Sequence, residues 1–529
     1  KEKEKCMCKT MKRLLFIIIV CIMLGSIGCE SIGGMNKASE AVTNETVLLP
    51  ESIQKPVVEL PHVEITLGLV AETYSAESPT TPEFATQVED MLTLLNQKAM
   101  DDGLNTTVKI KWLSSIYDLD MANQKDGVQC DAYFIRQQDS LELSQAGYIL
   151  PLNDLIKKHG PSYYKFLMEN PYVLKGMGID LEYQPIYILP TNRMGTDANV
   201  VLMDKQIADK YDLNITNLDD YVEAMRTIKA GGEQKIPSSF NIFDFFDEYM
   251  GLHGYRNYPT IFSYFKLDDT GSTIYPAVEI DEYKQMLVLL QELYNDQLTG
   301  SYRDLYTSLS MGETYSIITY PSLFLTQKNT LRKNKEFKIF PLMGSNRVYS
   351  QGVGLAISAN TQNPDRVMMF IDWIYSDPEC MEIWLYGGGL SEGVNPYYAL
   401  DDKGRITYKK PIDPMYDWLY VAGDTIFSME LARVPHYLPE GFVEIYIEIL
   451  NSCIPRSEMP YPGDSLEEGT GEYEELQQLL DECDKYYDYI PALLEFRTNP
   501  NYDVNKVFKD LEDAGLKDTA QKLTDLFSK

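Results

Sequence analysis

The 529-residue sequence has few histidines and tryptophans, four of each. It contains no Cys-x-x-Cys pair, and its histidines lack the spacing of metal ligands, so neither a zinc site nor a dithiol redox centre is indicated. A phosphate-binding P-loop and a dinucleotide fingerprint are also missing, which argues against a nucleotide-dependent enzyme. We therefore expect no cofactor and no bound metal.

Basic residues are scarce relative to acidic ones, with 47 Lys and Arg against 79 Asp and Glu and a net charge of −32. A chain this acidic is repelled by nucleic acid phosphates and by anionic lipid headgroups. We therefore expect no nucleic acid partner and no direct contact of the folded body with a membrane surface. The charge favours solubility instead.

The apolar run near the start, from Leu14 to Leu24, has 11 residues and is too short to span a membrane, which takes about 20. Lys12 and Arg13 precede it, and the small-residue stretch 25–28 follows it. This order is typical of a signal peptide that is cleaved after Gly28. We therefore expect residues 1–28 to be a leader.

Cys29 follows this leader directly and resembles the lipobox cysteine of bacterial lipoproteins, although Ser26 stands where that family prefers leucine. The resemblance implies that Cys29 carries a lipid and holds the chain on the extracellular face of the cytoplasmic membrane, as in Gram-positive bacteria. Ordinary secretion is the alternative. Residues 29–56 are rich in Ser, Gly, Asn and Thr and are expected to form a flexible linker.

The folded part begins with an apolar stretch at 63–70, which predicts a strand. Thr81-Pro82 predicts the start of a helix with an apolar face, and two further strands are expected at 108–112 and 132–135. Strand, helix and strand in this order are typical of a doubly wound α/β sheet. Later signals predict helices after Asn217, Asp281 and Asn363, and hairpin turns at 267–271 and 400–404.

Tyrosine is abundant, at 38 residues, and its ring with a polar edge suits wet interfaces and polar ligands, although composition bias alone could explain the number. The cysteines outside the leader and Cys29 are Cys130, Cys380, Cys453 and Cys483. Their spacing leaves disulfide pairing open.

Several segments together resemble one known family, the extracellular solute-binding proteins of ABC importers, family 1, and in particular its large Gram-positive lipoproteins with an extra C-terminal module. The segments that carry the resemblance are Asp131-Ala132-Tyr133-Phe134, 147–155, 188–192, 204–211, 217–221, 354–358, 363–364, 370–378 and 511–516. The match is dense over 130–230 and 345–405, and residues 410–500 match poorly.

The resemblance implies an α/β, two-lobed clamshell of the type II periplasmic-binding-protein class, with discontinuous lobes and a ligand between them. We place the crossings between the lobes near 184–192, 344–353 and 405–415. Lobe one is then 57–185 plus 350–408, and lobe two is 190–345 plus 412–529 with a C-terminal helical region. The family also implies a monomer that delivers its ligand to ABC permease subunits.

Ligand-binding side chains are expected where strands end at the crossing, because sugars are held by aromatic rings and by planar polar groups. The candidates are Glu72, Tyr74, Asp131, Tyr133, Arg136, Asn192, Arg193, Asp247, Tyr249, Tyr320, Ser322, Trp384 and Tyr386. For each aromatic residue, core packing is the alternative. The expected ligand is an oligosaccharide, with a peptide or another solute as the alternative on the same fold.

A secreted hydrolase is the rival function. Gly389-Leu390-Ser391-Glu392-Gly393 matches the Gly-x-Ser-x-Gly motif, and Asp424 and His436 follow in the order of an α/β-hydrolase. The motif needs a strand before the serine and a helix after it, whereas the sequence before it predicts a helix end. A glycosidase needs two facing carboxylates. With 79 acidic residues some such pair always exists, so the composition neither supports nor excludes a glycosidase. We therefore expect a receptor and no catalytic residues.

The anchor can be tested by replacing Cys29 with serine. Cys29→Ser should release the folded protein into the culture medium with unchanged ligand affinity, because the linker contributes nothing to ligand binding. Immunoblots of medium and membrane fractions measure the release. Retention of the variant on the membrane would mean that the leader remains as an uncleaved anchor.

Overall fold

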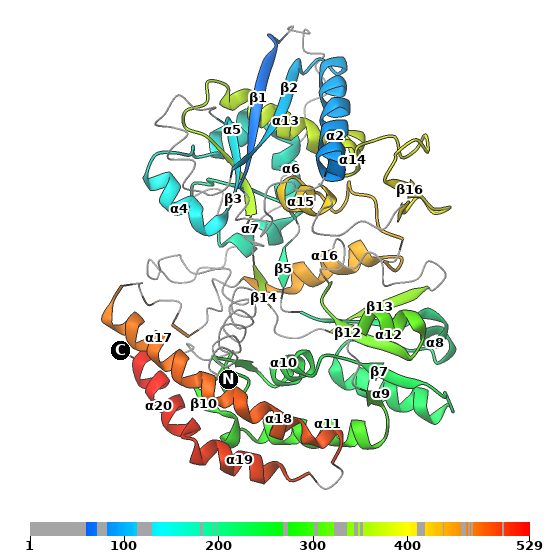
Figure 1. Cartoon of the computed structure of the whole chain (residues 1–529), viewed down its shortest axis with the longest axis vertical. Coiled ribbons are helices and arrows are strands. Elements are labelled where there is room, and N and C mark those ends of the chain that lie inside the picture. The colour runs from blue at the N-terminus through cyan, green and yellow to red at the C-terminus, as the bar shows by residue number, and fades with distance from the viewer. Residues whose placement is uncertain are drawn as a thin grey trace, which may run out of the picture.

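The structure is a computed structural model. It describes residues 60–70, 82–113, 130–179, 184–192, 194–196, 198–267, 273–300, 305–321, 336–342, 347–349, 353–409, 418–436, 438–455, 462–463, 466, 469–499 and 502–528. The predicted leader, Cys29 and the linker lie outside these residues. The described chain forms two α/β lobes, one above the other in Figure 1.

Lobe one is built on a twisted sheet in the order β2-β1-β3-β15-β4. Its strands are β1 (Val63–Val70), β2 (Thr106–Leu113), β3 (Ala132–Arg136), β4 (Leu189–Pro190) and β15 (Val353–Ile357). β1 runs parallel to β2 and β3, whereas β15 is antiparallel to β3 and β4. Gly68 is required in β1, because a Cβ there would lie 2.8 Å from Tyr133 Cδ1.

Helices cover both faces of this sheet. They are α2 (Pro82–Asp101), α4 (Gln137–Gln145), α5 (Asn153–His159), α6 (Pro161–Glu169), α7 (Pro171–Met177), α13 (Pro364–Ser376), α14 (Pro378–Tyr386) and α15 (Trp418–Thr425). The hairpin of β16 (Tyr398–Leu400) and β17 (Ile406–Tyr408) lies beside them. Local signals set the helix starts: proline occupies the first turn of α13 and α14, and Asp377 caps α14 by accepting a hydrogen bond from Glu379 N.

Lobe two has a sheet in the order β11-β7-β12-β6-β13. Its strands are β6 (Val200–Asp204), β7 (Ile236–Ser239), β11 (Thr299–Gly300), β12 (Thr314–Thr319) and β13 (Phe337–Pro341). A smaller antiparallel sheet of β8 (Tyr255–Asn257), β9 (Ser263–Lys266) and β10 (Tyr275–Pro276) lies beside it.

The helices of lobe two include four that close the chain. They are α8 (Lys205–Lys210), α9 (Leu218–Ala230), α10 (Ile242–Leu252), α11 (Asp281–Asn295), α12 (Leu305–Met311), α17 (Gly471–Cys483), α18 (Ile490–Leu493), α19 (Val504–Asp513) and α20 (Leu516–Phe527), with short 3-10 turns at 277–279, 484–489 and 494–497. Apolar residues of α17, α19 and α20 share one buried core with α9, α10 and α11. The C-terminal segment is therefore an integral part of lobe two.

The lobes are joined by a small sheet of β5 (Gly195–Thr196), β14 (Arg347–Tyr349) and β18 (Ile454–Pro455). β14 lies within the range expected for the second crossing, and β5 lies just after the range expected for the first. The third crossing is at β18 and not at 405–415. Helix α15 packs against α2, α14 and β15 of lobe one, so the expected start of the second part of lobe two at 412 was wrong.

Helix α16 (Phe442–Ser452) lies between the lobes in Figure 1. It packs against α7 of lobe one and β13 of lobe two. Tyr446 donates a hydrogen bond to Met194 O in the first crossing, at 2.6 Å. Its buried residues belong to a core that continues from lobe one to one face of the lobe-two sheet.

The local predictions were mostly confirmed. The predicted strand 63–70 has the bounds of β1, and the predicted helices correspond to α2, α9, α11 and α13. Asn217 caps α9 by accepting from Asp220 N. The turn at 400–404 joins β16 to β17, and β9 and β10 flank the predicted turn at 267–271, most of which lies outside the described residues.

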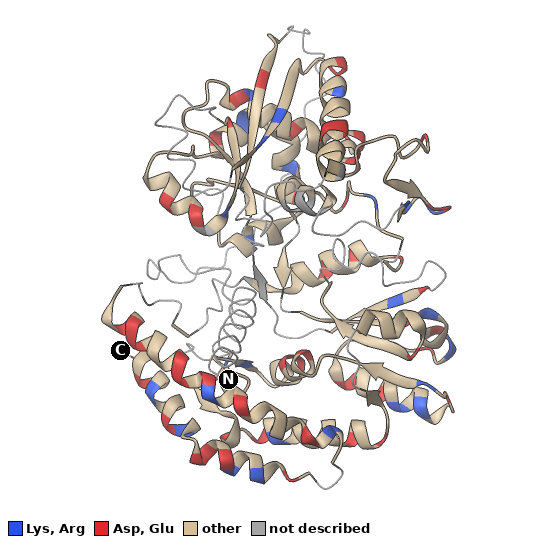
Figure 2. Ribbon diagram, in the orientation of Figure 1, with Lys and Arg blue, Asp and Glu red and all other residues tan. Residues whose placement is uncertain are grey.

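The four cysteines left open by the sequence, namely Cys130, Cys380, Cys453 and Cys483, are free and buried thiols. Within the described ranges, no helix combines the length and the hydrophobicity needed to cross a membrane. Acidic residues, red in Figure 2, occur on the outer helices of both lobes. The negative charge is therefore spread over the molecule.

Arg366 of α13 connects the start of the lobe-one sheet to the helices behind it. The residue is 6% exposed. Its Nη1 lies 2.9 Å from Leu104 O, 3.0 Å from Thr106 Oγ1, and 3.2 Å from both Asn105 O and Pro61 O. One buried cation thus fixes the entry to β1 and the turn between α2 and β2.

Arg366→Met should lower the free energy of unfolding by about 3 kcal/mol, because it leaves buried carbonyl groups without donors. Urea denaturation followed by tryptophan fluorescence measures this, since all four tryptophans are at positions 112, 373, 384 and 418 in lobe one. The control is Arg226→Met, whose side chain is 49% exposed and lies 3.8 Å from Glu223. An equal effect of both variants would contradict the role of Arg366.

Candidate functional site

The crossings leave each lobe at one edge of its sheet. In lobe two, Val200 at the start of β6 pairs with Thr319 at the end of β12 and with Pro341 at the end of β13. Leu342 N donates to Asn199 O at 3.0 Å just beyond this row. Tyr320, which follows Thr319, therefore lies at the edge from which the chain passes to lobe one.

In lobe one, the corresponding edge is formed by the end of β3 and the start of β15. Arg136 pairs with Val353, and Pro190 pairs with Gly354 on the other side of β15. The side chain of Arg136 is 39% exposed, and its Nε lies 3.4 Å from Asp139 Oδ2. A partly exposed guanidinium thus stands where lobe one meets the crossing strands.

Tyr320 is 47% exposed, and its hydroxyl donates to Asp244 Oδ1 at 2.9 Å. Asp244 lies in the first turn of α10 and is 5% exposed. Burial raises the pKa of this carboxyl to about 6, although the hydrogen bond from Tyr320 acts in the opposite direction. An exposed ring is thus fixed by a buried acid.

Glu248 lies one turn further along α10 and fixes the end of the first crossing. Its Oε1 accepts from Asn199 N at 3.1 Å and from Asn199 Nδ2 at 2.8 Å. Both residues are buried, at 6% and 2% exposure. α10 therefore supplies two hydrogen-bond acceptors: Asp244 accepts from the Tyr320 hydroxyl, and Glu248 accepts from Asn199 in the first crossing.

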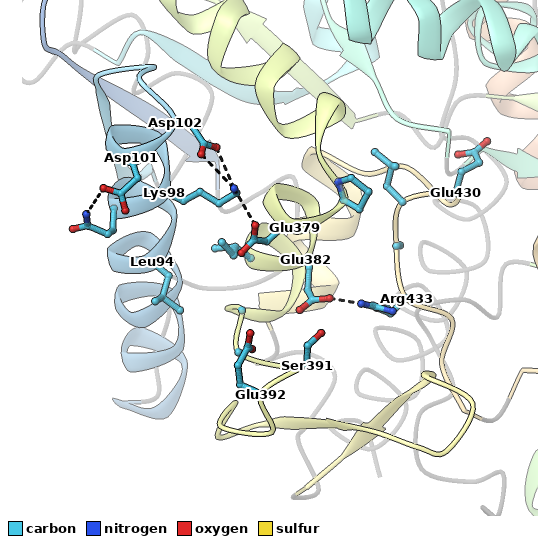
Figure 3. A pocket seen from close by; sticks show the side chains of 17 residues that line it. Leu94, Lys98, Asp101, Asp102, Glu379, Glu382, Ser391, Glu392, Glu430 and Arg433 are labelled. Carbon is cyan, nitrogen blue, oxygen red and sulfur yellow. Dashed lines mark hydrogen bonds and ion pairs between the residues drawn. The ribbon is translucent and has the colours of Figure 1, made fainter.

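A groove of about 850 Å³ lies on the flank of lobe one, between α2, α14 and residues 430–433 (Figure 3). Lys98 lies within it, and its Nζ is 3.1 Å from Asp102 Oδ2, 3.2 Å from Asp377 Oδ2 and 3.0 Å from Glu379 Oε2. Burial alone would lower the pKa of Lys98, but the hydrogen bonds to these carboxylates raise it overall. Asp102, Asp377 and Cys380 are close enough to hold a metal ion, yet the Lys98 ammonium already pairs with both of these carboxylates.

A family model described as bacterial extracellular solute-binding protein matches residues 93–379, which is more than half of the chain. The chain belongs to this family. The resemblance of the sequence segments is thereby confirmed, and the two α/β lobes agree with it.

This solute-binding protein is similar to solved structures of low sequence identity. The N-glycan transport solute-binding protein of Streptococcus pneumoniae is 15% identical, with 88% of this chain and 98% of that chain covered and a TM-score of 0.47. For a family 1 protein of Alicyclobacillus acidocaldarius the identity is 12%, the coverages 89% and 100%, and the TM-score 0.48. An HMO-binding, ABC-transporter-associated solute-binding protein of Bifidobacterium longum infantis is 13% identical, with 88% of this chain and 98% of that chain covered and a TM-score of 0.43. No curated protein matches the sequence.

Four aromatic candidates of the solute-binding protein pack in its cores. Tyr133 is 1% exposed, Tyr249 7%, Trp384 0% and Tyr386 1%. Trp384 contacts Trp418 at a ring separation of 5.2 Å, and Tyr249 lies between Phe245 and His253. Their expected role in ligand binding is therefore corrected, because buried rings do not reach a ligand. Burial of their apolar surface stabilises the cores instead.

The polar candidates Asp131 and Asp247 form internal hydrogen bonds. Asp131 accepts from Thr66 N at 2.8 Å and from Thr361 Oγ1, and Asp247 accepts from Asn257 Nδ2 at 2.6 Å.

Asn192 is fully buried in the first crossing. It accepts from Met429 N at 2.9 Å and donates to Glu430 Oε2 at 2.6 Å. The sequence thus places Asn192 at the crossing, where it ties two chain segments together.

Of the remaining candidates, Arg136 and Tyr320 lie at the sheet edges next to the crossing strands. Glu72, Tyr74, Arg193 and Ser322 lie outside the described residues. Sequence reasoning missed Asp244 and Glu248. Their signal is two acids four residues apart on helix 242–252, which also carries Asp247; this spacing places Asp244 and Glu248 on one helix face.

Ser391 of the Gly-x-Ser-x-Gly motif lines the groove but lacks the setting of a nucleophile elbow. α14 ends before it at Tyr386, and the next regular element is the strand β16. Nδ1 of His436 lies 3.1 Å from Ile406 O, and the Asp424 side chain lies outside the described residues. The strand-to-helix turn that would present a nucleophilic serine is not formed by the described residues 387–397.

Proposed function

We propose that this solute-binding protein is an extracytoplasmic receptor that captures an oligosaccharide between its lobes and delivers it to an ABC permease. In this proposal, a lipid on Cys29 holds it at the outer face of the membrane, and the linker 29–56 gives it reach. The receptor acts as a monomer and catalyses no reaction.

The observation that carries the proposal is the pair of lobe edges at the crossing strands. One edge bears the guanidinium of Arg136 and the other bears the ring of Tyr320, and both side chains are partly exposed. A tyrosine ring offers a flat apolar surface with a polar rim, and a guanidinium offers several donors in one plane. These are the groups that bind the two kinds of surface on a sugar ring, its C–H face and its hydroxyls.

The expected affinity is compatible with these groups. A micromolar dissociation constant corresponds to about −8 kcal/mol. Charge-assisted hydrogen bonds contribute about 1.5 to 3 kcal/mol each, so a few of them with one or two stacked rings suffice after the cost of closure. Glu72, Tyr74, Arg193 and Ser322, which the sequence predicts as ligand-binding residues, remain part of the proposal.

Thermal unfolding in the presence of neutral oligosaccharides, uronate oligomers and peptides tests the ligand class. An oligosaccharide at a hundred times its dissociation constant should stabilise the protein by about 2.7 kcal/mol, because it binds the folded state alone. For about 500 residues the entropy of unfolding is about 1 kcal/mol per kelvin, so such a gain raises the midpoint by about 2 to 3 °C. Stabilisation by peptides alone would contradict the carbohydrate ligand and leave the receptor role intact.

The same incubations distinguish a receptor from a hydrolase. Chromatography of each oligosaccharide after prolonged incubation should recover it unchanged. Ser391→Ala is the matched control, since it removes the hydroxyl of the hydrolase motif and should leave binding as it was. Product that forms with the wild type and disappears with Ser391→Ala would overturn the receptor proposal.

A further inference from the structure

The Tyr320 ring combines exposure with a fixed position. An exposed tyrosine normally samples several side-chain rotamers, and ordering it on binding costs free energy. Here the hydroxyl is bound at 2.9 Å by a carboxylate that is itself buried in the first turn of α10. The ring is therefore held in one orientation before any ligand arrives.

The acid that holds the ring has few other partners. Asn241 Nδ2 lies 3.3 Å from the same Oδ1 of Asp244. Among the described residues, no lysine or arginine forms an ion pair with Asp244. Burial raises its pKa to about 6, so the carboxylate is ionised at neutral pH and the hydrogen bond from Tyr320 is charge-assisted.

The charged groups near α10 come from each element packed against it. On α10 itself, Asp247 and Glu248 follow Asp244, and Arg256 of β8 donates to Asp247 O at 3.3 Å. Asp219 of α9 and Glu282 of α11 act on Tyr249, further along the helix. Tyr320 is the titratable group that contacts Asp244 from the β12 side. Acids thus predominate around this end of lobe two.

We propose that Asp244 is a positioning residue that holds the Tyr320 ring as a platform for a neutral sugar ring, and that it excludes uronate sugars from this half of the site. The inference rests on the proposed function and deepens it. A neutral pyranose can lay its C–H face on the fixed ring, whereas a carboxylate on the sugar would be repelled by the ionised Asp244.

The proposal predicts a specific dependence on pH. The folded-state pKa of Asp244 is above the ordinary value of 3.8, so protonation between pH 7 and pH 5 removes a buried charge and favours the fold. The same protonation weakens the bond to Tyr320. Asp244 therefore makes ligand affinity fall over a pH range in which its own contribution to stability rises.

Calorimetric titration with mannotriose, cellotriose, xylotriose and trigalacturonate, at pH 7.5 and pH 5, tests the proposal. At least one neutral trisaccharide should bind, and its dissociation constant should increase about three- to fivefold at pH 5. Asp244→Asn and Tyr320→Phe should bind about threefold more weakly than wild type at pH 7.5, with no further change at pH 5. Tyr320→Ala should lower the affinity for the neutral trisaccharide about tenfold.

Tyr164→Ala is the matched control, because this tyrosine on α6 is 38% exposed and belongs to lobe one, whereas Tyr320 belongs to lobe two. It should bind as the wild type does. Neutral binding that Tyr320→Phe and Asp244→Asn leave unchanged would overturn the positioning role, and tighter binding of trigalacturonate would overturn the ligand class. If no trisaccharide binds any variant while peptides bind, the proposed function itself fails, and this inference falls with it.

Discussion

Strands β5, β14 and β18 lie side by side where the chain passes between the lobes, and the rest of the architecture follows from this narrow passage. Strands of two or three residues contribute few backbone hydrogen bonds, so each lobe needs its own sheet and packed helices to be stable. The passage is supported by side chains instead. Glu248 binds both amide groups of Asn199, and Tyr446 of α16 binds Met194 O.

The passage also determines which side chains can share a ligand. Parallel strands present their carboxyl ends at one edge, and β3 and β12 end where the chain crosses. Arg136 and Tyr320 come from different lobes and are separated by 184 positions in the sequence, yet both stand at this boundary. A solute that contacts both must lie between the lobes, whereas the groove around Lys98 is confined to lobe one.

Sequence periodicity predicted the local elements well, since strand 63–70 and the capped helices depend on residues close together in the chain. It failed for the third crossing. Trp418 and Phe427 are apolar and could be buried in either lobe, and tertiary contacts such as those of Trp418 with Trp384 and Phe84 assign this segment to lobe one. The local sequence near 405–415 does not reveal such a tertiary contact, so it could not predict the lobe to which the segment belongs.

The same limit applies to the candidate site. Strand ends located Arg136 and Tyr320, but strand-end position does not distinguish a ligand-facing ring from a core ring such as Tyr133. The role of Asp244 depends on α10 packing beside β12, which links residues 76 positions apart. Such a partner can be seen as an unusual acid on an apolar helix, but its contact cannot be read from that helix alone.

The proposed capture requires that the lobes close on a solute held between them. Spin labels on Thr93→Cys of α2 and Arg226→Cys of α9 report the lobe separation, because the native thiols that the structure describes are buried. On addition of a binding oligosaccharide, pulsed electron spin resonance should show the distance distribution shift by more than about 2 Å and become narrower. An unchanged distribution at saturating ligand would contradict capture by closure of the two lobes.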